Sequence, residues 1–252
     1  MTDSPQTTAE NLPDAKIASY RENGFVSIPG ILSPAEVARF YDAALQTALQ
    51  NPPRRETPIF DQHVNVWTHS EAMKPLTLHP NIAAIATKLA GVPLRLWHDQ
   101  ILIKQPHNNA ATEFHQDQPY WPHSHSTHPI SCWVALCDVP VEKGCMTFIP
   151  GSHRRTDLPT QILSDATSLF RICPELEWEP RVTVPLRAGD CTFHHGRCAH
   201  MATPNFTDDP RVAHVVIYMD AETRYSGKPH VVTDPLELQT GDVLNHALFP
   251  AV

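Results

Sequence analysis

The stretch Glu113-Phe114-His115-Gln116-Asp117 decides how the rest of the chain is interpreted. Side chains alternate between the two faces of an extended strand, so His115 and Asp117 are expected to point the same way. An imidazole nitrogen and a carboxylate oxygen on one face can bind one metal ion, if a third ligand comes from elsewhere in the chain. Because the chain holds 16 histidines, an incidental His-x-Asp triplet stays open at this point.

The overall composition sets limits on fold and function. The 252 residues, of which 41% are hydrophobic, fit one large domain or two small ones with a real core. A net charge of -8 disfavours a nucleic-acid partner, and the chain has no apolar run long enough to span a membrane. The polar N-terminus shows no secretory signal, and the six cysteines form no C-x-x-C pair, so we expect reduced thiols in a cytoplasmic protein.

The N-terminal part is predicted to be helical. Residues 1–13 are expected to form a disordered tail, followed by a single domain over residues 14–252. We expect helices at residues 15–22, 34–49 and 81–89, with a strand at 24–28 between the first two. Ser33-Pro34-Ala35-Glu36 is a capping box with proline in the first turn, which fixes where the second helix begins. These helices are predicted to support the core and to carry no chemistry.

From Leu94 onward the chain reads as short alternating runs separated by Pro, Gly, Asn and His. Several short strands with turn signals between them predict a mainly β sandwich or barrel. A longer irregular insert at residues 151–180 is expected to hold one helical piece, Ser168–Ile172. The predicted strands are Leu94–Lys104, 112–117, 130–139, 145–149, 182–186, 190–195 and Arg211–Asp220.

Three downstream histidines, His194, His195 and His200, are candidates for the third metal ligand. Two histidines and one carboxylate on one side of an octahedron leave three positions open, which is the ligand set of non-haem Fe(II) oxygenases. His194 and His195 are adjacent on a predicted strand and face opposite ways. One of them can line the pocket or support a ligand, but an ordinary strand histidine is the simpler interpretation.

A series of motifs runs through most of the chain, from about Tyr20 to the Arg211 strand. The motifs are Lys104-Gln105-Pro106, His115-Gln116-Asp117, Gly144, Phe148-Ile149-Pro150-Gly151-Ser152-His153, Gly189-Asp190, Phe193-His194, His200, Pro204-Asn205 and Arg211. No single motif is decisive, but in their order and spacing they resemble one known family, the phytanoyl-CoA dioxygenases. The resemblance implies an Fe(II)- and 2-oxoglutarate-dependent oxygenase on a double-stranded β-helix, or jelly-roll, core.

Carried over residue by residue, the resemblance implies iron at His115, Asp117 and His200, and binding of the far carboxylate of 2-oxoglutarate by Arg211. The physical chemistry agrees, because Arg211 begins an apolar strand face and a buried guanidinium needs an anionic partner. An internal salt bridge to an Asp or Glu is the alternative for Arg211.

Other cosubstrate contacts are less certain from the sequence. The resemblance implies that Trp133 lines the methylenes of 2-oxoglutarate and that Lys104 reaches its keto-acid end, whereas a core tryptophan and an exposed strand-end lysine are the alternatives. The family often has a small hydroxyl residue two places after the distal histidine, but here that place is Ala202. Thr203 either replaces this hydroxyl or the contact is missing.

The run Pro119-Tyr120-Trp121-Pro122 directly follows the metal carboxylate, so Tyr120 and Trp121 are expected at the mouth of the site, in contact with substrate. We expect the enzyme to hydroxylate an unactivated C–H bond of a small metabolite, using Fe(II), O2 and 2-oxoglutarate and releasing succinate and CO2. Desaturation, cyclisation or epimerisation at the same iron, a non-catalytic jelly-roll binding module and a Zn enzyme are the alternatives. The sequence does not indicate the substrate or the oligomeric state.

Overall fold

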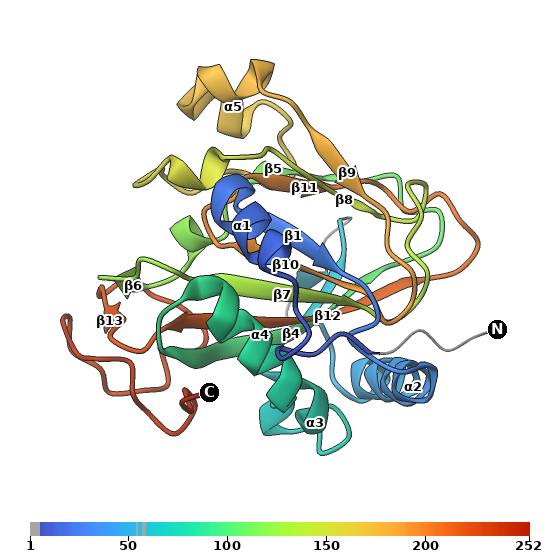
Figure 1. Ribbon diagram of the computed structural model, residues 1–252, viewed down its shortest axis with the longest axis horizontal. Coiled ribbons are helices and arrows are strands. Elements are labelled where there is room, and N and C mark those ends of the chain that lie inside the picture. The colour runs from blue at the N-terminus through green and yellow to red at the C-terminus, as the bar shows by residue number, and fades with distance from the viewer. Residues whose placement is uncertain (1–5, 54, 57–58) are drawn as a thin grey trace.

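Two antiparallel β-sheets face each other in the computed structural model, which describes residues 6–252 except 54, 57 and 58 (Figure 1). The predicted mainly β jelly roll with supporting N-terminal helices is confirmed by this arrangement. The larger sheet has seven strands in the order β1-β10-β7-β12-β4-β3-β2. These strands are β1 (Phe25–Ile28), β10 (Cys191–His195), β7 (Ile130–Ala135), β12 (Arg211–Asp220), β4 (Leu94–Lys104), β3 (Asp61–Val64) and β2 (Arg55–Glu56).

The smaller sheet has four strands in the order β5-β11-β8-β9 and lies above the larger one in Figure 1. Beyond it lie the insert helices α5 (Ser168–Ile172) and η4 (Pro174–Trp178). A two-stranded ribbon of β6 and β13 lies at one end of both sheets. The strands are β5 (Thr112–His115), β11 (His200–Ala202), β8 (Met146–Phe148), β9 (Val182–Val184), β6 (His123–Ser124) and β13 (Arg224–Tyr225).

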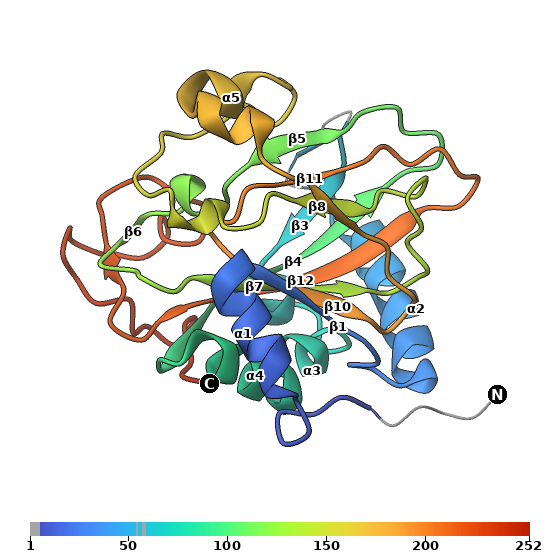
Figure 2. The same ribbon diagram turned by 45° about the horizontal axis from the view of Figure 1, so that its top comes forward.

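Helices cover the outer face of the larger sheet, away from the smaller one (Figures 1 and 2). Phe40 and Ala44 of one helix and Ile82, Ile85 and Leu89 of another are buried against this face. Burial of these side chains holds the helices on the sheet, because each fully buried aliphatic side chain contributes roughly 1.5–3 kcal/mol. These two helices are α2 (Pro34–Gln50) and α4 (Pro80–Ala90). The other helices are α1 (Asp14–Asn23), α3 (Lys74–Thr77), η1 (Val66–Thr68), η2 (Gln118–Tyr120) and η3 (Ser152–Arg154).

Strand β12 separates two buried regions by simple alternation. Val212 and Val216 belong to the core under the helices, while Ala213, Val215 and Ile217 belong to the core between the sheets. Strict alternation across a sheet buried on both faces produces this division. The inward face of β12 therefore points its first residue, Arg211, into the space between the sheets.

Most predicted elements are confirmed, with differences at their ends. Strands β4 and β12 and helix α5 have the predicted bounds, whereas strands β5 and β7 end earlier than expected, at His115 and Ala135. Asp117 was predicted to lie on a strand, which is wrong: its backbone is helical (φ -74°, ψ -43°) and precedes η2. The short strands β3 and β11 were not predicted.

Residues 6–13 lie against the domain, which differs from the disordered tail expected for residues 1–13. Leu12 is buried in the core under the helices, and the Thr7 amide donates to the Gly30 carbonyl over 3.1 Å. The amide of Ala9 also donates to Asn81 Oδ1 over 3.0 Å. One apolar side chain and a few backbone contacts are thus enough to attach a segment whose composition is polar. Residues 1–5 lie outside the described residues.

We predict that Ser33→Ala lowers the free energy of unfolding by about 1 kcal/mol. The Glu36 amide donates to Ser33 Oγ over 3.3 Å, and Ser33 Oγ donates to Glu36 Oε2 over 2.7 Å, so the substitution removes both bonds and leaves the Glu36 amide at the helix end without its capping acceptor. Urea unfolding followed by far-UV circular dichroism measures the change. Ser164→Ala, at an exposed hydroxyl, is the matched control, and equal stability of the two variants would contradict the prediction.

Candidate metal centre

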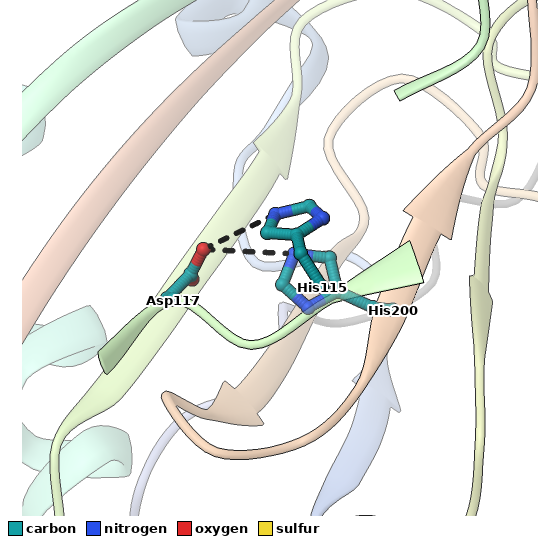
Figure 3. A group of neighbouring side chains, drawn as sticks. All are labelled: His115, Asp117 and His200. Atoms are coloured by element: carbon teal, nitrogen blue, oxygen red, sulfur yellow. Dashed lines mark ion pairs between the residues drawn. The ribbon is translucent and has the colours of Figure 1, made fainter. Parts of the chain in front are cut away.

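Three side chains from two neighbouring strands and the turn after one of them meet between the sheets (Figure 3). His115 ends β5 and stands directly opposite His200 in the β5–β11 pairing. Asp117 Oδ1 lies 3.5 Å from Nε2 of His115 and 3.8 Å from Nε2 of His200. One ligand atom from each residue lies within 4.8 Å of the others, and the part of the chain that the structure describes holds no second such group.

The turn after β5, rather than strand alternation, brings Asp117 beside His115. The side chain of Gln116 fixes this turn by donating from Nε2 to the carbonyls of Arg197 (2.7 Å) and Arg155 (3.0 Å). Its backbone amide donates to Gln161 Oε1 over 2.8 Å. A buried amide with several partners is costly to displace, so Gln116 holds the turn in one conformation.

Both histidines present Nε2 to the centre of the cluster. His115 Nδ1 lies 2.7 Å from the Glu113 carbonyl and His200 Nδ1 lies 2.9 Å from the Cys198 carbonyl. A carbonyl only accepts, so each Nδ1 carries the proton and each Nε2 keeps its lone pair. This tautomer is the one that binds a metal through Nε2.

The second oxygen of Asp117 has its own partners. Asp117 Oδ2 lies 3.3 Å from His194 Nε2 and 3.4 Å from Ser131 Oγ. His194 and Ser131 are directly opposite each other in the pairing of β10 with β7, so the sheet register sets both. Oδ1 is left facing the two imidazoles. The sequence had favoured an ordinary strand histidine for His194, because only the strand pairing reveals this contact.

Burial and neighbouring charges favour the metal-binding protonation states. Burial, followed by the nearby His115, lowers the pKa of His200 to about 3, so its imidazole is neutral near pH 7. Burial opposes ionisation of Asp117, but the imidazoles of His200, His115 and His194 outweigh it and hold its pKa well below the usual range. Neutral imidazoles with an ionised carboxylate are the forms that Fe(II) requires.

Arg211 lies at another part of the same cavity and is 2% exposed. Its guanidinium carbon is 5.2 Å from the centre of the Trp133 ring, and Nη1 donates to the Leu102 carbonyl over 3.3 Å. Nε is buried without a hydrogen-bond partner, and no carboxylate among the described residues lies within 4 Å of the guanidinium. The internal salt bridge considered for Arg211 is therefore not formed within the described part of the chain, and an anion from outside would satisfy it.

Lys104 stands directly opposite Arg211 in the β4–β12 pairing and is fully buried. The alternative of an exposed strand-end lysine is wrong. Its Nζ donates to the Ala110 carbonyl over 2.9 Å, and burial together with Arg211 lowers the pKa of Lys104 to about 7. Gly144 has φ +77°, and a Cβ there would lie 3.0 Å from Arg211 Nε, so only glycine fits beside the paired cations. Lys104 lies behind the cavity wall rather than on it.

The hydroxyl groups near Arg211 differ from the sequence-based expectation. Thr203 Oγ1 donates to the Val141 carbonyl over 2.7 Å, and Thr203 does not line the cavity. Ala202 does line it and stands opposite Thr112, which lines it too. The structure thus brings Thr112, which sequence reasoning missed, to the place where a hydroxyl was expected.

One cavity of about 410 Å³ connects these groups. Tyr120 and Trp121 both line it, as expected from their position after Asp117, and the Tyr120 hydroxyl donates to the Gln161 carbonyl over 2.6 Å. The volume is typical of a small-molecule site. The cluster of His115, Asp117 and His200 fits a metal ion, and the buried guanidinium of Arg211 fits the carboxylate of a dianionic cosubstrate. The aromatic side chains fit an organic substrate.

Comparisons with known proteins agree with this geometry. The family model described as phytanoyl-CoA dioxygenase (PhyH) matches residues 20–213. The chain belongs to the phytanoyl-CoA dioxygenase family. It is 27% identical over 158 residues to phytanoyl-CoA dioxygenase domain-containing protein 1 of Mus musculus, covering 61% of this chain and 54% of that protein. The chain thus spans about half the length of the curated relatives it matches.

Two solved structures of this chemistry are similar over nearly the whole chain. The non-heme alpha-ketoglutarate-dependent carbocyclase SnoK from nogalamycin biosynthesis is 38% identical with a TM-score of 0.89, covering 99% of this chain and 100% of that one. The epimerase SnoN, in complex with Fe3+, alpha-ketoglutarate and nogalamycin RO, is 38% identical with a TM-score of 0.83, covering 94% and 97%. The predicted family and fold are confirmed.

We predict that His194→Leu weakens Fe(II) binding by about 10- to 100-fold, because Asp117 loses the donor that orients its carboxylate. Anaerobic Fe(II) titration of the metal-free protein, without cosubstrate, measures this. His194→Asn keeps an N–H donor and should recover part of the affinity. The neighbouring His195, whose Nε2 contacts the Thr127 carbonyl, provides the control His195→Ala. Unchanged affinity in a folded His194→Leu variant would rule out this role.

Proposed function

We propose that this protein binds Fe(II) through His115, Asp117 and His200 and oxidises an unactivated C–H bond of a small-molecule metabolite, with release of succinate and CO2. The observation that supports this best is the single cavity that contains both the three-residue cluster and Arg211, a buried cation without an acidic partner among the described residues. A metal centre alone would not need Arg211, and a salt-bridged arginine could not bind a dicarboxylate.

Each residue has a definite task in this proposal. Nε2 of the two histidines and Oδ1 of Asp117 hold the metal, while Arg211 binds the far carboxylate of 2-oxoglutarate and Trp133 packs along its chain. Lys104 lies behind the wall opposite Arg211, where a bound carboxylate would favour its protonated form. Tyr120 and Trp121 exclude water and contact substrate. Bound iron, 2-oxoglutarate and O2 supply the oxidising power that the side chains lack.

Hydroxylation is the default outcome, and ring closure or epimerisation is the second candidate. The second is favoured by the likeness to SnoK and SnoN, a carbocyclase and an epimerase that are each 38% identical to this chain. By analogy with these two proteins, we propose that the substrate is a secondary metabolite. Mass spectrometry separates the outcomes, because hydroxylation adds one oxygen, ring closure removes two hydrogens and epimerisation leaves the mass unchanged.

Arg211 also separates the proposed function from its two alternatives. A Zn enzyme would use the two histidines and Asp117 but not Arg211, and a non-catalytic module would need neither. All six cysteines are free, which supports the reducing cytoplasm that we propose as the location. Among the described residues, none of the helices has the length and apolar character to cross a bilayer.

We predict that the wild-type protein releases succinate slowly from 2-oxoglutarate with Fe(II) and O2 alone, and faster when a metabolite panel includes its substrate. Asp117→Ala should reduce succinate release more than about 100-fold, because the metal loses its only charged ligand. Asp138→Ala is the control, since Asp138 accepts from the Ala188 amide on the surface. Full turnover by the Asp117 variant without added iron would refute the proposed function.

We predict that Thr112→Val weakens 2-oxoglutarate binding by roughly fivefold, the effect of one lost hydrogen bond. Thr112 lines the cavity opposite Ala202, so its hydroxyl can donate to the carboxylate that Arg211 binds. Thr203→Val is the matched control and should leave the affinity unchanged. Anaerobic calorimetric titration with 2-oxoglutarate measures both, and the reverse order of effects would restore Thr203 as the cosubstrate contact.

A further inference from the structure

The cavity wall across from the metal cluster carries a pair of linked glutamines. Gln62 of β3 and Gln100 of β4 both line the cavity, on the larger sheet, whereas His115 and His200 come from the smaller sheet. In the β3–β4 pairing Gln62 stands opposite Leu102 and Val64 stands opposite Gln100, so the two glutamines are diagonal neighbours. Gln62 Nε2 donates to Gln100 Oε1 over 2.6 Å.

This bond leaves the carbonyl group of Gln62 and the NH2 group of Gln100 unused. No partner within the described part of the chain is found for Oε1 of Gln62 or for Nε2 of Gln100. Turning both amides over would exchange their roles but would still leave one donor and one acceptor beside each other. When a substrate displaces water from the cavity, these atoms must find partners on it, because an unpaired polar group in a dry site is costly.

Lysine and arginine are scarce around this pair. The lysine, arginine and acidic side chains that line the cavity are Asp117, Arg211 and Lys228. The first two serve the metal and the cosubstrate in the proposed function, and Lys228 is exposed, with its Nζ donating to the Pro119 carbonyl and to Thr160 Oγ1. Beside the pair itself the lining has the ring of His98, two residues before Gln100 on β4. A carboxylate on the substrate near the glutamines would therefore be desolvated beside a histidine ring, with no lysine or arginine free of another task to pair with it.

Apolar side chains surround the glutamine pair on the same wall. Val64 and Leu102 lie beside it on β3 and β4, and Val215 and Ile217 continue the wall on β12. A wall that is apolar except for the amide pair and His98 orients a ligand by a few polar contacts and binds it by burial. The pair faces the metal ligands across the cavity, so a group held there also fixes which carbon of the substrate points at the metal.

We propose that the reacting half of the substrate is uncharged and carries a carbonyl or hydroxyl oxygen, which Gln62 and Gln100 bind beside an apolar ring or chain. This inference rests on the proposed function and specifies its substrate class. The glutamine pair is a specificity-determining element, and a substrate with a carboxylate next to the reacting carbon is excluded.

Three matched ring compounds test the proposal: 1-tetralone, tetralin and tetralin-2-carboxylate. Their binding is measured by calorimetry to the protein loaded anaerobically with Fe(II) and 2-oxoglutarate, and also to the metal-free protein. We expect the ketone to bind about fivefold more tightly than the hydrocarbon, the factor for one added hydrogen bond. We expect the carboxylate to bind at least about tenfold more weakly than the ketone, because no lysine or arginine near the glutamines is free to pair with its charge.

Variants connect this preference to the glutamines. Gln100→Leu and Gln62→Leu should each remove the advantage of the ketone over tetralin. Gln105→Leu is the control, since Gln105 donates to Asp61 Oδ2 and does not line the cavity. The proposal is overturned if the carboxylate binds as tightly as the ketone, if the ketone preference survives in both variants, or if no probe binds.

The proposed function and the assignment of the glutamine pair are contradicted by different results. A wild-type protein that releases no succinate from 2-oxoglutarate contradicts the proposed function, whatever the probes do. A wild-type protein that releases succinate but shows no ketone preference contradicts only the assignment of the glutamine pair.

Discussion

The direct pairing of His200 with His115 across β11 and β5 is the contact on which the site depends. Two more cross-strand pairs complete it. His194 with Ser131 holds the second oxygen of Asp117, and Arg211 with Lys104 places two basic side chains at the proposed cosubstrate end. Because a one-residue slip turns every side chain of a strand to the other face, the sheet register that folds the protein also assembles its chemistry.

The metal-binding side chains and Arg211 lie in a buried space between the sheets, where polar groups are unfavourable without binding partners. Buried His200 is neutral and Asp117 is ionised, and Arg211 has no acid beside it among the described residues. Folding alone does not satisfy this arrangement, since a buried cation and a row of metal-binding atoms are costly without partners. Binding of a metal and a dicarboxylate would stabilise the fold, because both bind only the native state.

The sequence predicted a strand or a site residue where it carried a clear pattern, either alternating apolar residues or a series of motifs. The ten or more alternating residues of β4 and β12 fixed those strands and the inward direction of Arg211, whereas β3 (Asp61–Val64) and β11 (His200–Ala202) carry no alternating apolar pattern of their own. The order of motifs predicted His115, Asp117 and His200 as ligands, and the structure brings these three side chains together. The contacts of His194, Thr112 and the Gln62–Gln100 pair could not be predicted, because each depends on which residue stands across a strand pair.

The central claim is that one metal ion sits between Nε2 of His115, Nε2 of His200 and Oδ1 of Asp117, with the cosubstrate tail at Arg211. Anomalous diffraction at the iron edge, from crystals grown anaerobically with Fe(II) and 2-oxoglutarate, tests it most directly. The account predicts one strong peak touching all three ligand atoms and a carboxylate paired with the Arg211 guanidinium. A peak elsewhere, or a cosubstrate density that leaves Arg211 without an anion, would contradict it.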